Sequence, residues 1–359
     1  MSFPSSAPSK PPVRRRAAAV ITALALLGGV SCSQDAVEVA PPTIPPASPA
    51  VSPPAVNPPA GVVRPLAGTP QAATFDAVGA ALVVLSPGPE PAAPAVLTVF
   101  GGGSGPGRVI ELPGPATALA GNGEGQVYLS TRGGYFIVDI GAADRSATTA
   151  RVEVGDQSET DFTAIARRAD GRMVLGSADG AIFILDPTTG SVATVSHQRK
   201  IFARVDSIVT AGDTAVVLDR GQTSVTAINA DGEAAQALRA GDGATTIVAD
   251  PVGRILVADT RGEELLVFSA NPLIMRQRYP VASAPYGLAG SAQLAWVSQT
   301  AANSVVGYDL STGIPVEKVR YPTVQQPNSL GYDPATDTLY VVSGSGAGVQ
   351  VIGDATGSR

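Results

Sequence analysis

The sequence contains one cysteine, one histidine and one tryptophan in 359 residues. A structural zinc site of the Cys/His type needs several such ligands and a disulfide needs two cysteines, so the chain can form neither by itself. His197 would have to act alone in any histidine-based catalysis. Positive charge is also scarce, because 24 Lys and Arg face 30 Asp and Glu and leave a net charge of −6. This acidic balance argues against a nucleic-acid partner.

Glycine and proline are abundant instead, with 40 and 31 residues, or about a fifth of the chain against a usual share near 12%. This composition favours a β fold with many tight turns, or such a fold joined to a disordered segment. Helical periodicity is absent after residue 61. The glycine-rich stretches 101–107 and 343–348 do not open a helix, so we interpret them as turns rather than phosphate-binding loops. We expect no cofactor and no bound metal.

Residues 1–31 have the features of a secretory signal peptide. Three arginines at 14–16 form a positive patch, and an apolar run of about 11 residues follows from 17 to 27, within the 7–15 expected of such signals. A membrane-spanning helix needs about 20 apolar residues. The run ends earlier, at two glycines, so we expect an export signal rather than a transmembrane anchor.

Cys32 directly follows this signal and the small residues Val30 and Ser31. The arrangement resembles a bacterial lipobox, in which the cysteine is acylated after export. Gly29 departs from the leucine that is usual at the third position before the cysteine. An ordinary signal peptide with an incidental cysteine is the alternative. We expect a lipidated, palmitate-type anchor at Cys32, which would hold an exported protein at the cell membrane, facing the extracytoplasmic space.

Residues 32–60 combine the lipidation site with a proline-rich stretch that reads APPTIPPASPAVSPPAVNPPA from residue 40. Proline fixes φ and removes a backbone donor, so this segment cannot join a helix or the interior of a sheet. We expect a disordered, extended tether that lifts the following domain away from the membrane.

Residues 61–353 repeat a unit of four short apolar runs separated by turn residues. Between Phe162 and Val195, for example, the separators are ADGR, SADG and DPTTG. The second runs recur about every 40–46 residues, the interval of a four-stranded propeller blade. Seven units fill the region and leave 354–359 as a short tail, so the sequence predicts an all-β, seven-bladed β-propeller, with six or eight blades as alternatives. The second runs are centred near Val84, Leu129, Leu175, Val217, Val257, Val297 and Val342.

The last unit has only three apolar runs. Residues 61–68, GVVRPLAG, can supply its fourth strand, so that the two ends of the domain pair and close the ring. Trp296 alternates with apolar neighbours and is predicted to pack between blades.

Several longer runs, among them ETDFTAIARR, VVLDRGQTSVT and TGIPVEKVRYPTVQQPNSL, resemble the LppL group of mycobacterial lipoproteins. The resemblance covers the signal, the proline-rich segment and the whole repeat region. It implies an exported lipoprotein of the cell envelope with a propeller domain. It supplies no catalytic residues.

In a propeller, the loops between second and third strands share one face with the loops that join neighbouring blades, and ligands often bind there. Arginines occupy similar positions in three of these hairpins and could together hold a carboxylate or a phosphate. Alternatively, each arginine pairs with a neighbouring aspartate and braces adjacent blades. The candidate ligand-face residues are Arg132, Asp161, Arg204, Asp206, Arg220, Arg261, Tyr286 and Asn328, with Gln326 beside them.

Two classes of function follow from this interpretation. The first is a binding or scaffolding module for an envelope protein or a small molecule. The second is a lactonase-like or other hydrolytic propeller, which would need a deep pocket with a convergent acid or histidine and an arginine. His197 follows a fourth apolar run and is expected in a solvated loop, and no GxSxG nucleophile motif is present. The sequence therefore favours binding over catalysis and names no catalytic residue.

Overall fold

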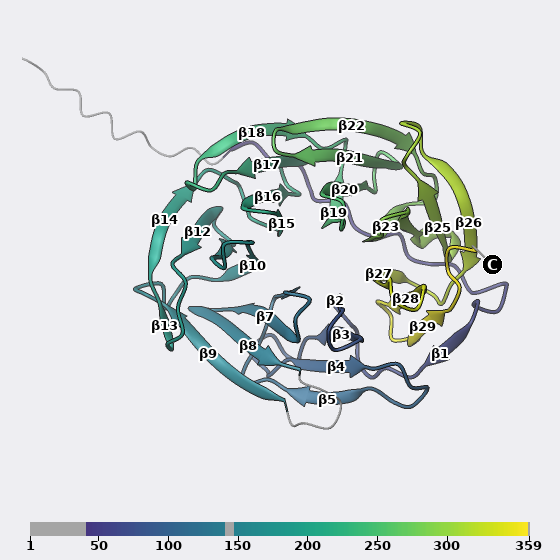
Figure 1. Ribbon diagram of the computed structural model, residues 1–359, viewed down its shortest axis with the longest axis horizontal. Coiled ribbons are helices and arrows are strands. Elements are labelled where there is room, and N and C mark those ends of the chain that lie inside the picture. The colour runs from purple at the N-terminus through teal and green to yellow at the C-terminus, as the bar shows by residue number, and fades with distance from the viewer. Residues whose placement is uncertain (1–40, 141–146, 358–359) are drawn as a thin grey trace, which may run out of the picture. The chain divides into compact units, whose positions relative to one another are not determined.

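The computed structural model describes residues 41–140 and 147–357. They form seven antiparallel sheets around a central channel, which is a seven-bladed β-propeller (Figure 1). The predicted fold class is confirmed. The predicted signal peptide and Cys32 lie outside the described residues. No helix in the described ranges is long and apolar enough to span a membrane.

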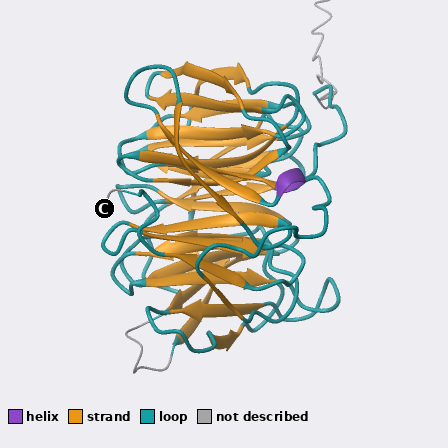
Figure 2. Cartoon of the chain, turned by 90° about the vertical axis from the view of Figure 1, so that its right-hand side faces the viewer, coloured by secondary structure: helices purple, strands orange, loops and turns teal. Residues whose placement is uncertain are grey.

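Each blade runs from an inner strand at the channel to an outer strand at the surface, and Figure 2 shows that the strands run between two faces where the loops gather. The first three blades comprise β2 (Ala72–Asp76), β3 (Ala81–Ser86), β4 (Val96–Phe100) and β5 (Arg108–Glu111); β6 (Ala118–Gly121), β7 (Gln126–Thr131), β8 (Gly134–Asp139) and β9 (Thr148–Val154); and β10 (Phe162–Arg167), β11 (Met173–Ser177), β12 (Ala181–Leu185) and β14 (Val195–Lys200). A short strand, β13 (Val192–Ala193), pairs in parallel with β9.

The next three blades comprise β15 (Ser207–Ala211), β16 (Thr214–Asp219), β17 (Ser224–Ile228) and β18 (Ala234–Arg239); β19 (Ala244–Ala249), β20 (Arg254–Asp259), β21 (Glu264–Ala270) and β22 (Leu273–Pro280); and β23 (Pro285–Gly290), β24 (Leu294–Gln299), β25 (Ser304–Asp309) and β26 (Val316–Pro322). The seventh combines β27 (Pro327–Asp333), β28 (Thr338–Ser343), β29 (Val349–Ile352) and β1 (Val62–Arg64). The 3-10 turn η1 (Thr300–Ala302) joins β24 to β25.

The second strand of every blade is buried on both sides by the neighbouring blades. Its sequence is therefore a continuous apolar run rather than an alternating one. In β16 and β24 all six residues are buried, whereas the outer strand β18 is almost entirely exposed. The seven predicted run centres all fall in second strands, and each is at most 1% exposed.

The predicted ring closure is confirmed. β1 pairs antiparallel with β29, with Val62 opposite Val351 and Arg64 opposite Val349. Arg64 is 5% exposed, and its guanidinium donates hydrogen bonds to the carbonyls of Gly101 and Gly105, each at 2.7 Å. The glycine-rich loop 101–107 therefore fixes the closing strand to the first blade. Burial lowers the pKa of Arg64 below its ordinary value.

The one tryptophan and the one histidine of the sequence lie in opposite environments, the first buried and the second exposed. Trp296 is fully buried, and its ring lies 6.1 Å from that of Tyr332 in the next blade, which confirms the predicted packing between blades. His197 lies within the outer strand β14 and not in a loop as predicted. An outer strand is exposed to water, so a solvated imidazole can lie within it and does not require a loop.

The proline-rich segment differs from the expected disordered spacer in residues 42–53, which we name the strap. It is extended, as its prolines require, but it lies along one face of the propeller; Figure 1 shows it in purple. The amide of Ile44 donates to the carbonyl of Gly221 at 2.8 Å, and the amide of Ala50 donates to Thr300 Oγ1 at 3.1 Å. Proline lacks a donor and leaves carbonyls unpaired within the segment, so the loops of the propeller supply their partners.

The end of the described chain also packs on the propeller. Ala355 is fully buried, its amide donates to the carbonyl of Asp337 at 3.0 Å, and its carbonyl accepts from the hydroxyl of Tyr321 at 3.0 Å. Residues 354–357 of the predicted tail thus form turns that pack against the last two blades.

Candidate ligand-binding site

The strap lies on the face that the sequence singled out for ligand binding. We name it the hairpin face. It consists of the loops that join neighbouring blades and the loops between second and third strands, which are residues 87–95, 132–133, 178–180, 220–223, 260–263, 300–303 and 344–348.

The central channel holds two cavities lined by the seven inner strands. One, of about 340 Å³, lies where these strands begin, at the hairpin face. The other, of about 450 Å³, lies farther along the same strands. Four of the eight candidate residues line the first cavity: Asp206 and Arg220 come from loops, and Tyr286 and Asn328 come from the starts of the inner strands β23 and β27. The structure therefore brings half of the predicted set together at the channel mouth.

Asp206 is the acidic group of this cavity. Its side chain is 12% exposed, it accepts a hydrogen bond from the backbone amide of Arg220 at 2.8 Å, and it forms an ion pair with Arg204, whose Nε lies 3.2 Å from Asp206 Oδ1. Burial raises the pKa of the Asp206 carboxyl above its ordinary value, despite the opposing effect of these two arginines. Arg204 does not line the cavity itself but contacts Asp206, which does.

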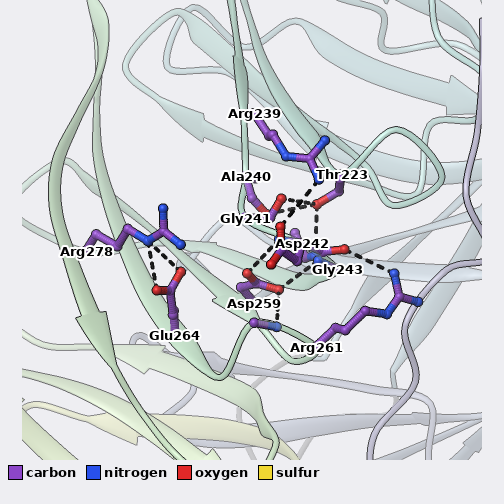
Figure 3. Close-up of polar contacts among 12 residues, drawn as sticks. Thr223, Arg239, Ala240, Gly241, Asp242, Gly243, Asp259, Arg261, Glu264 and Arg278 are labelled. Carbon is purple, nitrogen blue, oxygen red and sulfur yellow. Dashed lines mark hydrogen bonds and ion pairs between the residues drawn. The ribbon is translucent and has the colours of Figure 1, made fainter.

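Arg220 and Arg261 both reach out of the propeller to the strap. The Arg220 guanidinium donates to the carbonyl of Ala47, and its Nε atom is buried without a hydrogen-bond partner in the described part of the chain. Arg261 donates to the carbonyl of Pro45 at 2.7 Å and to that of Asp242 at 3.0 Å. Figure 3 shows the latter bond, with the purple ribbon of the strap beside Arg261. Neither arginine pairs with the aspartate that precedes it in its hairpin.

Arg132 and Asp161 form a separate cluster on the second and third blades. Arg132 pairs with Glu159, and its Nη1 lies 3.9 Å from Asp161 Oδ1. Both candidate side chains are more than half exposed. Neither lines the channel cavities. Of the three hairpin arginines, Arg132 is therefore the one held by acidic side chains.

Tyr286 and Asn328 complete the cavity wall from the starts of the inner strands β23 and β27, where each is the second residue. Asn328 Oδ1 accepts a hydrogen bond of 3.1 Å from Gln326 Nε2. Gln326 also binds the strap, since the same amide nitrogen donates to the carbonyl of Ala50 at 2.8 Å. The cavity wall and the strap thus share one side chain.

Two buried carboxylates that sequence reasoning did not assign hold the hairpin face in shape. Asp259 is fully buried and accepts the backbone amides of Asp242, Gly243 and Gly262 at 2.7, 2.8 and 3.0 Å (Figure 3). Asp219 accepts the amides of Ala203, Arg204 and Gln222 in the same way. The signal in the sequence is an aspartate at the end of a second apolar run, in LDRG and ADTRG. These aspartates tie a hairpin to the loop entering the same blade.

No group of three or more His, Cys, Asp and Glu side chains in the described ranges is placed to hold a metal ion. The chemistry that the site offers is hydrogen bonding and charge: two guanidinium groups, one carboxyl of raised pKa, a phenol and two amides.

Comparisons with known proteins support the fold. No family model and no curated protein matches the sequence. A streptogramin B lyase structure superposes with a TM-score of 0.62 at 11% identity, over 81% of this chain and 96% of that chain. Hydrazine synthase of Kuenenia stuttgartiensis gives 0.63 at 15% identity, over 82% and 98%. A chain of the mitotic checkpoint complex gives 0.63 at 12% identity, over 85% and 95%.

These similarities concern the propeller alone. The three structures are of a lyase, a synthase and a checkpoint assembly, and identities of 15% or less carry the fold but not an activity.

Proposed function

We propose that this chain is an exported lipoprotein of the cell envelope whose propeller binds a protein or small-molecule ligand at the hairpin face. The observation that carries the binding role is the meeting of Asp206, Arg220, Tyr286 and Asn328 around one cavity of about 340 Å³. A concave site lined by a few convergent polar groups is the usual basis of ligand binding.

Binding is favoured over the lactonase-like alternative by the position of the only histidine. His197 is exposed on the outer strand β14, whereas a hydrolase would need its base at the channel. Asp206 has a raised pKa, but Arg204 and the Arg220 amide already occupy its oxygens. We therefore assign these groups to ligand binding.

The envelope location rests on the sequence. A positive patch, a short apolar run and Cys32 follow one another in the order of a lipoprotein signal, and longer runs resemble the LppL group. Lipid anchorage would place the hairpin face in the extracytoplasmic space, with the membrane as one partner and an envelope protein or small molecule as the other.

The anchor is tested by replacing its one reactive side chain. We expect Cys32→Ala to move the protein from the membrane fraction to the soluble fraction, because the thiol that would carry the acyl chain is gone. Fractionation followed by immunoblotting measures this, with Ser31→Ala as the control that keeps the thiol. A Cys32→Ala protein that still sediments with membranes contradicts the lipid anchor.

The binding role is tested on the two arginines that reach across the face. We expect the double variant Arg220→Ala/Arg261→Ala to bind inorganic phosphate at least tenfold more weakly, since both guanidinium groups are lost. Thermal-shift titration measures the affinity, and Arg132→Ala is the matched control, because Arg132 occupies the same hairpin position but is paired with Glu159. A large loss of melting temperature with unchanged phosphate binding would assign these arginines to bracing.

A further inference from the structure

The strap is held mostly through its backbone; the exception is the Ser52 hydroxyl, which donates to the carbonyl of Thr300 at 2.6 Å and accepts the amide of Gln326. Side chains of the hairpin face donate to four of its carbonyl oxygens, at distances of 2.7–2.9 Å where the contact is of ordinary length. The pairs are Arg261 with Pro45, Arg220 with Ala47, Gln326 with Ala50, and both Asn303 and Gln325 with Pro53. The face therefore recognises the carbonyls of an extended chain more than particular side chains.

Gln326 makes the most specific of these contacts. Its Nε2 donates to the carbonyl of Ala50 at 2.8 Å, its Oε1 accepts the amide of Ser52 at 3.1 Å, and its own amide donates to Ser52 Oγ at 2.8 Å. The side-chain amide thus pairs with two positions of the strap as a neighbouring β-strand would. We name the Gln326 side-chain amide the clamp. Gln326 has a φ of 55°, in the left-handed region, and this backbone conformation directs the clamp toward the strap.

Two glycines of the face leave room for the strap. A Cβ atom on Gly243 would lie 3.0 Å from Ala47 Cβ, and one on Gly221 would lie 3.2 Å from Thr43 Cγ2. Ala47 is the one strap residue that is buried, at 6% exposure. These glycines form a shallow track that fits an extended chain with a small side chain at this position.

Little apolar surface holds the strap in place. Val51 is 90% exposed and Ile44 is 39% exposed. A second chain of the same kind can therefore take its place without opening the hydrophobic core. Proline-rich chains suit such a track, because they are extended before binding and lose little conformational entropy.

We propose that the part of the hairpin face formed by blades four to seven is a binding site for extended, proline-rich peptide segments of partner proteins, and that the strap is its resident occupant. This rests on the proposed function of the face as a ligand site and names the class of ligand. The strap competes at an effective concentration of about 1 mM, as expected of a short covalent connection. If the strap sequence itself has a Kd of about 100 µM for the emptied face, a partner binds the parent protein about tenfold more weakly than it binds the emptied face.

The test uses the full chain with residues 42–53 replaced by a Gly/Ser sequence of the same length, so that β1 still reaches β29. The probe is a labelled synthetic peptide with the sequence of residues 41–55, PPTIPPASPAVSPPA, and fluorescence anisotropy measures its binding. We expect saturable binding to the replaced protein and about tenfold weaker binding to the parent. A Gly/Ser peptide of equal length is the control ligand, and we expect it to bind at least tenfold more weakly.

Gln326→Gly in the replaced protein removes the clamp and suits the left-handed backbone, so it should keep the melting temperature and weaken the peptide at least tenfold. Arg132→Ala is the matched control that should leave peptide affinity unchanged, because Arg132 does not contact the strap. Absence of peptide binding while inorganic phosphate still shifts the melting temperature overturns this inference and leaves the proposed function standing. Absence of both overturns both.

Discussion

At the scale of single residues, buried carboxylates shape the hairpin face by binding backbone amides. Asp259 accepts three amide protons while fully buried, so it replaces the water that these loop amides would otherwise need. The sequence alone suggested instead that hairpin aspartates would pair with neighbouring arginines. A short side chain at the end of a buried strand cannot turn outward to do so, because the entering loop closes over it.

We expect Asp259→Ala to lower the free energy of unfolding by about 3 kcal/mol or more, because it leaves three buried amides without an acceptor. Urea unfolding followed by circular dichroism measures the change. The control is Asp231→Ala, which removes an exposed turn carboxylate and should change stability by less than about 0.5 kcal/mol. Equal small effects in both variants would contradict the bracing role of Asp259.

Among the strands, the closing strand β1 is only three residues long. Its attachment to the propeller therefore depends on the contacts of its side chains as well as on its pairing with β29. Arg64 makes side-chain contacts with residues that are distant along the sequence. Its guanidinium donates to two carbonyls of the loop 101–107 and lies 4.7 Å from the ring centre of Phe100. The glycine-rich sequence of this loop predicts a turn. It could not show that its carbonyls hold a cation 37 to 41 residues away.

We expect Arg64→Ala to cost about 2–4 kcal/mol of stability, because both the charge-assisted hydrogen bonds and the contact with Phe100 are lost. Arg64→Lys should recover only part of this loss, since an ammonium group cannot reproduce the fork of the guanidinium. Arg276→Ala, on an exposed outer-strand position, is the control for removal of an arginine. Chemical unfolding of the three variants would contradict this account if alanine and lysine behaved like the parent.

At the scale of the whole molecule, the N-terminal region does two separate things. Residues 62–64 close the ring, whereas the strap covers part of one face and buries little surface. Pairing with β1 covers β29, which would otherwise form the outer edge of the seventh blade, and a propeller protects its sheets by leaving only short edges exposed.

Two shortened chains separate these roles. We expect a chain that begins at Pro59 to keep its melting temperature within a few degrees, because β1 remains and the described residues that are lost are only 41–58, which include the strap. A chain that begins at Gly68 lacks β1 and should unfold at a clearly lower temperature and associate through the exposed edge of β29. Thermal unfolding and size-exclusion chromatography measure both effects. A monomeric, equally stable chain from Gly68 would show that closure contributes little.

The fold could be predicted from the sequence, because four short strands separated by turns in each blade leave a pattern that recurs about every 40–46 residues. It also located the second strands, the closing strand and the packing of Trp296. Each of these depends on local apolar patterning, which a single sequence records directly.

Only the tertiary structure decided which charged residues meet. Arg132, Arg220 and Arg261 occupy similar hairpin positions in the sequence, yet one pairs with Glu159 and two bind the strap. The path of the strap was equally hidden, because a proline-rich segment has no pattern that names its docking surface. Its place is set by donors from four blades that lie far apart in the sequence and come together only when the ring is closed.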